Sequence, residues 1–395
     1  MRYGAAVASG FMSVASVSGI RYSFGVLIPA IALDLGVSLA MITGAVTLHW
    51  VVFTVTAPLA WRLFARIGAR AMIIAGGAAS CMGMVLCALI DTPWGVILSF
   101  GILVGAGTHG FGQMTAGAPL TGAPAATRDR SLGVIASGAP VGTAVYPAFA
   151  AVLAASIGWR LTAVMLGTAV LALTLISSDL LKGMPSLLLP DALSPGVRTR
   201  TLWFNGTFLL LAAAFLITLG TQIAVPLLMP VWAIEMGMTA EQLAVAFVVF
   251  GVSGLAGRLV LTSMTNMTRL RLWVTVPAAA FAVAGCGVAV FSAAVPGMYV
   301  ATALLGISTP VFGALFTIAA LACFPPSLYP RVTGSMLVPI GIGAALAPLL
   351  MSSVIDDDGS TTVIWIGIAV LIAAASILFL VAEVGSPVHR ARARA

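Results

Sequence analysis

The run LVGAGTHGFG at residues 103–112 recurs 201 residues later in the chain as LLGISTPVFG at residues 304–313. Leu, Gly, Thr, Phe and the last Gly occupy the same five places in both runs. Both runs are apolar and rich in small residues, as expected for helices that pack closely inside a membrane. The recurrence therefore indicates that the chain is built from two copies of one unit.

The offset of 201 residues also aligns charged, proline and turn residues along most of the chain without a gap. Apolar helices match by chance because Ala, Leu, Val and Gly dominate them, but these rarer residue types seldom match in one register. The aligned sets are Pro29, Asp34, Gly36 and Ser38 with Pro230, Glu235, Gly237 and Thr239; Arg70 with Arg271; and Arg130, Gly133, Gly142, Ala144 and Pro147 with Arg331, Gly334, Gly343, Ala345 and Pro348. We therefore expect two parallel repeats.

The composition places both repeats in a membrane. The chain of 395 residues is 61% hydrophobic and only 7% charged, with a mean hydropathy of +1.15, whereas about a quarter of the residues of a soluble domain are charged. These values exclude a cytosolic enzyme, a nucleic-acid binder, a secreted disulfide scaffold and a disordered chain. The four cysteines lie in apolar runs without ligand spacing, so we interpret them as small core residues.

Division of the chain at charged residues and at Pro or Gly gives twelve segments of the roughly 20 residues that cross a bilayer. They begin near Gly4, Leu39, Ala71, Trp94, Ser131, Leu161, Leu202, Ala240, Leu272, Gly297, Val332 and Thr361. We expect an all-α membrane protein with twelve transmembrane helices in two parallel six-helix repeats. The predicted domains are an N-terminal bundle at residues 1–181, a cytoplasmic linker at 182–201, a C-terminal bundle at 202–385 and a basic cytoplasmic tail at 386–395.

The basic residues indicate the orientation, because Lys and Arg gather in cytoplasmic loops. With the N-terminus inside, 15 of the 18 basic residues are cytoplasmic and only Arg160 lies in an outer loop. We therefore expect a multi-pass membrane protein with both termini in the cytoplasm. The net charge of +7 reflects this topology, so it does not indicate a nucleic-acid partner.

The arrangement resembles the major facilitator superfamily, whose members have two six-helix halves. The family's loop between helices 2 and 3 usually reads GxxxDRxGRR, of which this chain keeps Arg66, Gly68 and Arg70. A closer resemblance is to the branch that contains monocarboxylate transporters and oxalate/formate antiporters, including bacterial relatives. The segments that carry it are residues 19–29 and 34–38 in and after helix 1, 128–142 in helix 5, 158–160 before helix 6 and 257–259 in helix 8.

That resemblance implies a secondary active transporter for a small, monocarboxylate-like organic anion that works by alternating access. It implies no enzymatic activity and no cofactor. A proton or a counter-anion can accompany the substrate, by symport or antiport. Because the resemblance includes bacterial relatives, we expect the protein to work as a monomer in the lipid bilayer of the bacterial inner membrane. Some relatives place an Asp four residues before the helix 8 arginine, where this chain has Gly254.

The ionisable residues within the predicted spans are all basic or neutral. Arg21, Arg258, His49 and His109 lie at membrane depth, and every carboxylate of the sequence falls outside the membrane core. A charge in the membrane is costly and usually faces a cavity or the bundle interior. Two guanidinium groups without an acid predict an anionic substrate whose carboxylate takes a bidentate contact. The alternative is that each arginine binds backbone carbonyls or a loop acid and only joins helices.

Three more residues complete the predicted substrate site or its coupling. Gln113 follows His109 by one helical turn, which predicts that both project from one helix face. Gln222 occupies the position equivalent to Arg21 and is a candidate neutral counterpart across the cavity. His109 is the first candidate proton carrier and His49 the second, because histidine titrates near neutral pH. The alternative for Gln222 and both histidines is a hydrogen bond between helices.

Two other classes of function compete with anion transport. Drug or amphipathic-compound efflux by the same fold is the alternative, supported by the run GAPVG at residues 138–142 and by abundant Met and Phe. Cationic drugs would require an acid in the membrane, however, and the sequence has none there. A membrane enzyme or channel is less well supported, because we find no metal-ligand cluster, no nucleophile with a base and no nucleotide-binding loop.

The charge asymmetry yields the first testable prediction. In a variant without the native cysteines, a cysteine at Ser360 should react with an impermeant thiol reagent in intact cells, and a cysteine at Ser186 should not. Labelling of both positions in opened cells is the control. Reaction at Ser186 together with protection at Ser360 would reverse the predicted orientation.

Overall fold

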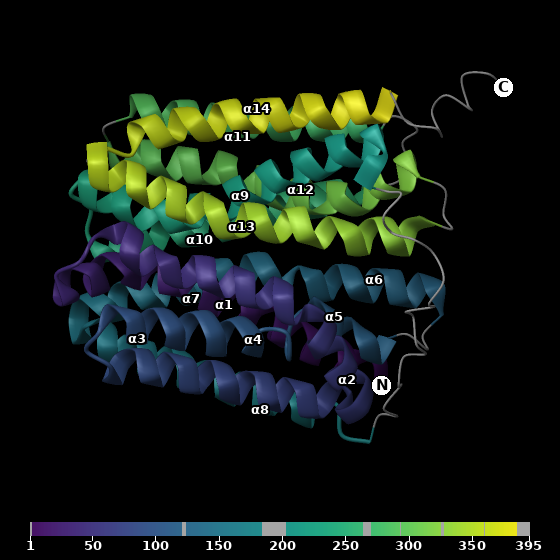
Figure 1. The fold of residues 1–395 in the computed structure, drawn as a ribbon, viewed down its shortest axis with the longest axis horizontal. Helices are drawn as coiled ribbons and strands as arrows, with labels where there is room; N and C mark the ends of the chain where they lie inside the picture. The colour runs from purple at the N-terminus through teal and green to yellow at the C-terminus, as the bar shows by residue number, and fades with distance from the viewer. Residues whose placement is uncertain are drawn as a thin grey trace.

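The structure is a computed structural model that describes residues 2–120, 124–183, 203–263, 270–292, 294–324, 328–358 and 360–384. Its elements within these ranges are helices (Figure 1). The N-terminal half contains α1 (Arg2–Leu35), α2 (Leu39–Leu89), α3 (Pro93–Leu98), η1 (Ser99–Val104), α4 (Gly105–Gly107), α5 (Gln113–Gly117), η2 (Ala118–Leu120), α6 (Ala125–Ala136), α7 (Gly138–Ile157) and α8 (Trp159–Asp179). The C-terminal half contains α9 (Gly206–Glu235), α10 (Ala240–Ser263), α11 (Leu270–Phe291), α12 (Val295–Cys323), α13 (Tyr329–Asp358) and α14 (Thr362–Val384).

The described helices account for the twelve predicted spans. Eight of them are long and apolar enough to cross a membrane, and three shorter apolar helices begin at Pro93, Thr275 and Val295. The helix α2 supplies two spans, because its 51 residues are interrupted at Gly68 by a φ of 76° and a ψ of 172°. An uninterrupted helix of that length would measure about 75 Å, more than twice the thickness of the hydrocarbon core. The predicted fold class is confirmed.

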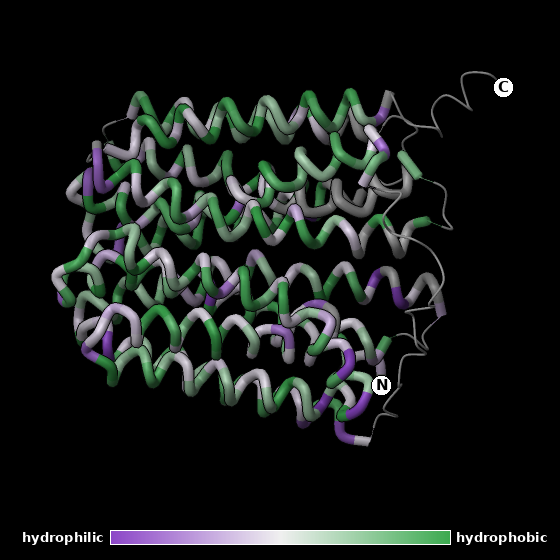
Figure 2. The backbone as a smooth tube through the Cα atoms, viewed as in Figure 1, coloured by the Kyte–Doolittle hydropathy of each residue, from purple (hydrophilic) through white to green (hydrophobic). Residues whose placement is uncertain are grey.

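The polar residues concentrate at the two ends of the bundle, and its middle is mostly apolar (Figure 2). The beginning of α1 and the end of α14 lie at the same end (Figure 1). The described range thus contains an even number of crossings. The predicted linker at 182–201 and tail at 386–395 lie largely outside the described residues, and the predicted domain boundaries remain predictions.

Contacts between helices repeat at the offset of 201 residues. A side chain on Gly142 of α7 would overlap the carbonyl oxygen of Ala15 in α1. In the other half, a side chain on Gly343 of α13 would overlap the carbonyl oxygen of Leu216 in α9. Each residue of the first pair is thus offset by 201 positions from its counterpart in the second. The two halves therefore use one packing scheme, in which glycine lets two backbones touch.

The acidic residue that ends the first helix of each half also makes equivalent contacts. The Asp34 carboxylate accepts hydrogen bonds from Trp159 at 3.2 Å and Arg160 at 2.8 Å, at the start of α8. The Glu235 carboxylate accepts bonds from the Thr361 hydroxyl at 2.6 Å and the Thr361 amide at 3.1 Å, at the start of α14. Arg160 and Thr361 are again 201 residues apart. One anchor thus has an ion pair and the other only hydrogen bonds.

The segment at residues 99–120 departs from a regular helix. It consists of the π-helix η1, the three-residue α4, a turn at residues 108–112, the short α5 and the 3-10 helix η2. Glycine disfavours helix by about 1 kcal/mol relative to Ala, and this segment is rich in it. Side chains on Gly107 and Gly110 would overlap the backbone of α2 near Gly76. The glycines therefore permit close contact with α2 and weaken the helix where they occur.

The close glycine contact between α1 and α7 gives a prediction about stability. We expect Gly142→Ala to lower the free energy of unfolding by roughly 1 to 3 kcal/mol, because the new methyl group overlaps backbone that cannot rotate away. Gly133→Ala is the matched control, since a methyl group there meets nothing within 4 Å. Thermal unfolding of the purified protein in detergent measures both variants. Equal midpoints for Gly142→Ala and the wild type would contradict this packing.

Candidate functional site

A polar cluster in the N-terminal half forms around Arg21, in the middle of α1. The Nε atom of Arg21 donates a hydrogen bond to Nε2 of His49 in α2 at 3.0 Å. The Nη2 atom of Arg21 donates a bond of 3.3 Å to the Thr108 hydroxyl, which in turn donates to the carbonyl oxygen of Gly105. The partners of this cation are neutral groups on two other segments, so the guanidinium keeps its positive charge uncompensated.

Two aromatic rings flank the same guanidinium. The Cζ atom of Arg21 lies 4.5 Å from the ring centre of Trp50 and 4.7 Å from that of Phe53. Both rings follow His49 on α2, and they meet edge to face with centroids 5.5 Å apart. Such rings stabilise a cation by about 0.5 to 2 kcal/mol without neutralising it. They therefore hold the Arg21 head group in place while its positive charge remains.

His49 is buried, with 1% of its surface exposed. Its Nε2 accepts the bond from Arg21, so this nitrogen carries no proton, and a neutral ring then has its proton on Nδ1. No hydrogen-bond partner for Nδ1 exists among the described residues. The ring also lies against Phe100, with centroids 5.3 Å apart. His49 is thus a neutral hydrogen-bond acceptor for Arg21 with one orphaned donor.

His109 lies beside the cluster in the turn after α4. Its Nε2 is 2.7 Å from the backbone carbonyl oxygen of Phe53, and its ring stacks on the Phe53 ring with centroids 4.1 Å apart. A carbonyl oxygen only accepts, so His109 donates from Nε2. The predicted pairing of His109 with Gln113 on one helix face is wrong, because the turn at residues 108–112 separates them. Gln113 is exposed at the start of α5.

Arg258 lies in α10, five residues before Ser263, and is half-buried. Its Nε is buried without a hydrogen-bond partner among the described residues. The preceding Gly257 touches α12, since a side chain there would overlap the carbonyl oxygen of Ile307. The structure does not join Arg258 to the Arg21 cluster by any contact in the described part of the chain. Arg258, the second predicted anion-binding residue, is therefore a cation of the C-terminal half that is separate from the Arg21 cluster.

The remaining predicted site residue is Gln222 in α9. It is half-buried and forms no hydrogen bond with the residues that the structure describes. Arg21, His49 and His109 are therefore brought together, whereas Gln113, Gln222 and Arg258 lie outside their cluster. Sequence reasoning missed Thr108, Trp50 and Phe53. Trp50 and Phe53 follow His49 by one and four positions, so an amphipathic reading of α2 could have found Phe53.

The C-terminal half offers an internal comparison for the cluster. The residues equivalent to Arg21, His49 and His109 are Gln222, Phe250 and Pro310, none of which titrates. The helix packing nonetheless matches, because Gly105 meets the backbone of His49 and its equivalent Gly306 meets the backbone of Phe250. The packing of this helix pair therefore does not require the polar side chains. Their presence in one half points to a role beyond packing.

The described carboxylates lie at helix ends. Asp34 and Asp91 bind Arg160, each at 2.8 Å, at the same end of the bundle as Asp356. Glu241 lies in the first turn of α10, and Asp179 and Glu383 lie at or near the ends of α8 and α14. No group of His, Cys, Asp and Glu able to hold a metal ion occurs among the described residues. The electrostatic character of the described interior is thus positive.

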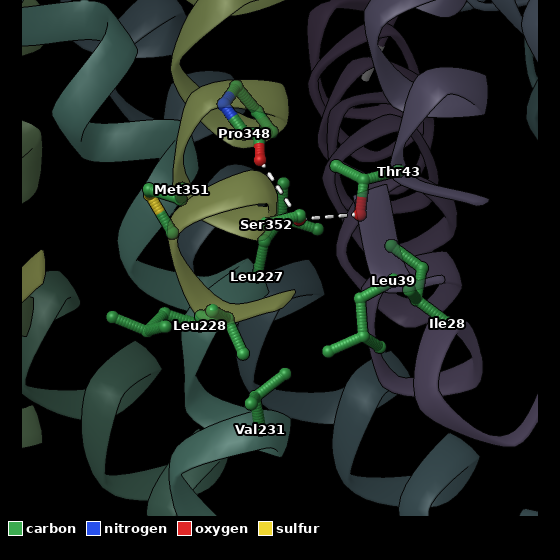
Figure 3. Close-up of a pocket in the computed structure, with 10 residues that line it drawn as sticks. Ile28, Leu39, Thr43, Leu227, Leu228, Val231, Pro348, Met351 and Ser352 are labelled. Atoms are coloured by element: carbon green, nitrogen blue, oxygen red, sulfur yellow. Dashed lines mark hydrogen bonds between the residues drawn. The ribbon is translucent and has the colours of Figure 1, made fainter. Parts of the chain in front are cut away.

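The two halves meet at the Asp356 end of the bundle. The Asp356 carboxylate accepts hydrogen bonds from the backbone amides of Leu39 at 3.1 Å and Ala40 at 2.8 Å, at the start of α2. One turn deeper, the Ser352 hydroxyl donates to the Thr43 hydroxyl at 2.7 Å (Figure 3). The side chains around this pair line a mostly apolar pocket: Ile28, Leu39, Leu227, Leu228, Val231, Pro348, Met351 and Ile355. These contacts close that end.

Comparison with known proteins agrees with this architecture. A family model described as Major Facilitator Superfamily matches residues 10–315. No curated protein matches the sequence significantly. A solved bacterial homolog of the human lysosomal transporter Spinster, inward-facing and unoccupied, is similar with a TM-score of 0.67 and 17% identity over 97% of this chain and 95% of that one. A crystal structure of the nucleoside transporter NupG gives a TM-score of 0.75 and 10% identity over 95% of this chain and 99% of that one.

Proposed function

We propose that this chain, which belongs to the Major Facilitator Superfamily, is a secondary active transporter that moves a small, monocarboxylate-like organic anion by alternating access. Its family and its similarity to solved transporters indicate a transporter rather than an enzyme. The observation that carries the anion assignment is the state of its two membrane arginines. Arg21 binds only neutral partners, and the buried Nε of Arg258 has no partner among the described residues.

An uncompensated guanidinium in a membrane is unfavourable unless a counter-charge reaches it. A carboxylate satisfies a guanidinium with two parallel hydrogen bonds, which no neutral substrate reproduces. The described interior supplies no such carboxylate. A substrate that brings its own carboxylate therefore gains most from this site. Arg21 in one half and Arg258 in the other can serve as successive or joint contacts, since the halves move relative to each other.

Alternating access requires the closed end of the bundle to open. The closing contacts join α2 of one half to α13 of the other. They are the bonds of Asp356, the pair of Thr43 and Ser352, and the bond that the Thr47 hydroxyl donates to the carbonyl oxygen of Ala345 at 2.8 Å. Most of the close glycine contacts lie within one half, which suits movement of the halves as rigid units. Gly251 of α10 is an exception, because it meets the backbone of Pro140 and Ala144 in α7 of the other half. We infer that these few polar contacts are the ones that break when the opposite conformation forms.

Drug efflux has less support. The run GAPVG at 138–142 packs on α1, since side chains on Gly138 and Gly142 would overlap the backbone at Phe11 and Ala15. A packing role therefore accounts for these glycines. Cationic drugs also lack an acidic partner in the described interior. Our proposal includes function as a monomer, a place in the bacterial inner membrane and cytoplasmic termini, with a proton or counter-anion moving alongside the substrate.

The proposal predicts the behaviour of Arg258 variants. Arg258→Gln should weaken anion transport about 10- to 150-fold, because a lost charge-assisted hydrogen bond costs roughly 1.5 to 3 kcal/mol. Arg258→Lys should recover part of it, since an ammonium group keeps the charge but not the planar fork. The measurement is uptake of radiolabelled formate, pyruvate, lactate, oxalate and succinate into proteoliposomes.

A neutral sugar and a cationic dye are the substrate controls, and correct folding is checked by size-exclusion chromatography. Transport of the dye in preference to all five acids would favour efflux of amphipathic compounds. Normal acid transport by Arg258→Gln would assign that arginine a structural role.

The closed end yields a further prediction. In a background without native cysteines, Thr43→Cys with Ser352→Cys should form a disulfide on oxidation, because the native hydroxyl oxygens are 2.7 Å apart. The disulfide should abolish transport, and reduction should restore it. The matched control is Ser13→Cys with Ser177→Cys, whose hydroxyl oxygens are 3.2 Å apart within one half. If the oxidised variant with Cys at positions 43 and 352 transports as fast as the reduced one, opening at this end is ruled out.

A further inference from the structure

We infer that His49 is the proton site of the transporter, and that anion binding at Arg21 is what allows His49 to take up its proton. The inference rests on the proposed anion transport and adds the coupling ion and the means of coupling. It starts from the bond between Arg21 Nε and His49 Nε2, which is 3.0 Å long. That bond occupies the only nitrogen of a neutral His49 that can accept a proton.

Without substrate, His49 cannot take up a second proton. In an imidazolium, the N–H of Nε2 would point at the Nε–H of Arg21, so two donors would face each other. The imidazolium would also place a second positive charge beside Arg21. No described group near His49 supplies a negative charge to offset the second positive charge. The titratable residues that interact with it are Arg21 on α1 and His109 after α4. The described acids of the neighbouring α8 and α13 lie at the ends of those helices.

A bound carboxylate changes this balance. It attracts the Arg21 guanidinium into a bidentate contact and neutralises its charge, so Arg21 no longer needs the lone pair of His49. The freed Nε2 takes a proton from the solution that delivered the anion, and the imidazolium then donates toward the bound carboxylate. Anion and proton enter together and leave together, and the cluster keeps its net charge of +1. The transport cycle is accordingly electroneutral.

Two observations favour His49 over His109 in this role. His49 alone shares a hydrogen bond with the arginine, whereas His109 donates to the backbone carbonyl of Phe53. The buried Nδ1 of His49 also lacks a partner among the described residues. A purely structural histidine at this depth would be expected to satisfy both nitrogens. The equivalent position of the other half is Phe250, so packing of this helix pair does not demand an imidazole.

The test uses the full chain in proteoliposomes with radiolabelled pyruvate and lactate, a pH-sensitive dye inside, and potassium with valinomycin to set the voltage. Protein-free liposomes give the background from diffusion of the undissociated acids. We expect wild-type uptake to acidify the interior with one proton per anion and to ignore the voltage. His49→Gln keeps an oxygen that can accept from Arg21, so it should take up the anion without acidification, and an inside-positive voltage should accelerate its uptake.

His389→Gln, in the predicted cytoplasmic tail, is the matched control and should behave as the wild type does. His109→Gln should still acidify the interior with one proton per anion, whatever its rate of uptake. Acidification that persists in His49→Gln, or that disappears only in His109→Gln, would overturn the inference. So would voltage-driven uptake by the wild type. Absence of saturable uptake of both acids by the wild type would instead overturn the proposed monocarboxylate function on which the inference rests.

A second measurement covers the case in which His49→Gln fails to fold. Nitrogen-15 NMR of the histidine-labelled wild type distinguishes the two neutral tautomers, and the chain has only three histidines to assign. We expect His49 without substrate to carry its proton on Nδ1, and its ring to become doubly protonated when pyruvate or lactate is added. A His49 signal with the proton on Nε2, or one that does not respond to a saturating transported anion, would contradict the mechanism.

Discussion

Helices in a bilayer gain little from excluding water from one another, so their association depends on how closely their backbones approach. This chain meets that constraint with glycines at fixed places. Gly142 lies against Ala15, and Gly343 against Leu216, so the first and fifth spans of each half touch through main-chain atoms. Large side chains at these contacts would separate the helices. Arg21 is carried by α1, one of the helices held in this way.

Within this scaffold the chain treats its buried positive charge in an unusual way. Arg21 is not neutralised by an acid but held by a histidine lone pair, a hydroxyl oxygen and two aromatic rings. Each of these partners fixes the guanidinium without cancelling its charge. The arginine at one end of the bundle shows the opposite arrangement, since Arg160 binds both Asp34 and Asp91. The same residue type is therefore ion-paired at one end of the bundle and without a counter-charge among the described residues of its interior.

The repeat was predictable because charged, proline and turn residues recur in one register, and the contacts of Asp34 and Glu235 follow that register. The twelve spans were predictable because charges bound them. The bond between Arg21 and His49 was not, since it depends on how α1 and α2 rotate against each other. The pairing of His109 with Gln113 failed because helical spacing was assumed through a glycine-rich segment, where contact with α2 replaces regular helix.

The closing contact of Asp356 has a consequence for how this protein can change over evolution. Its carboxylate binds the main-chain amides of Leu39 and Ala40, so the recognised groups belong to every amino acid except proline. The side chains at the start of α2 can vary with the lipid or the environment without loss of the contact. For this contact only one of the two halves needs a particular side chain, whereas the neighbouring bond from Ser352 to Thr43 needs one from each half. Co-variation between the partners would consequently be absent here, and a search for correlated substitutions would overlook this contact between the halves.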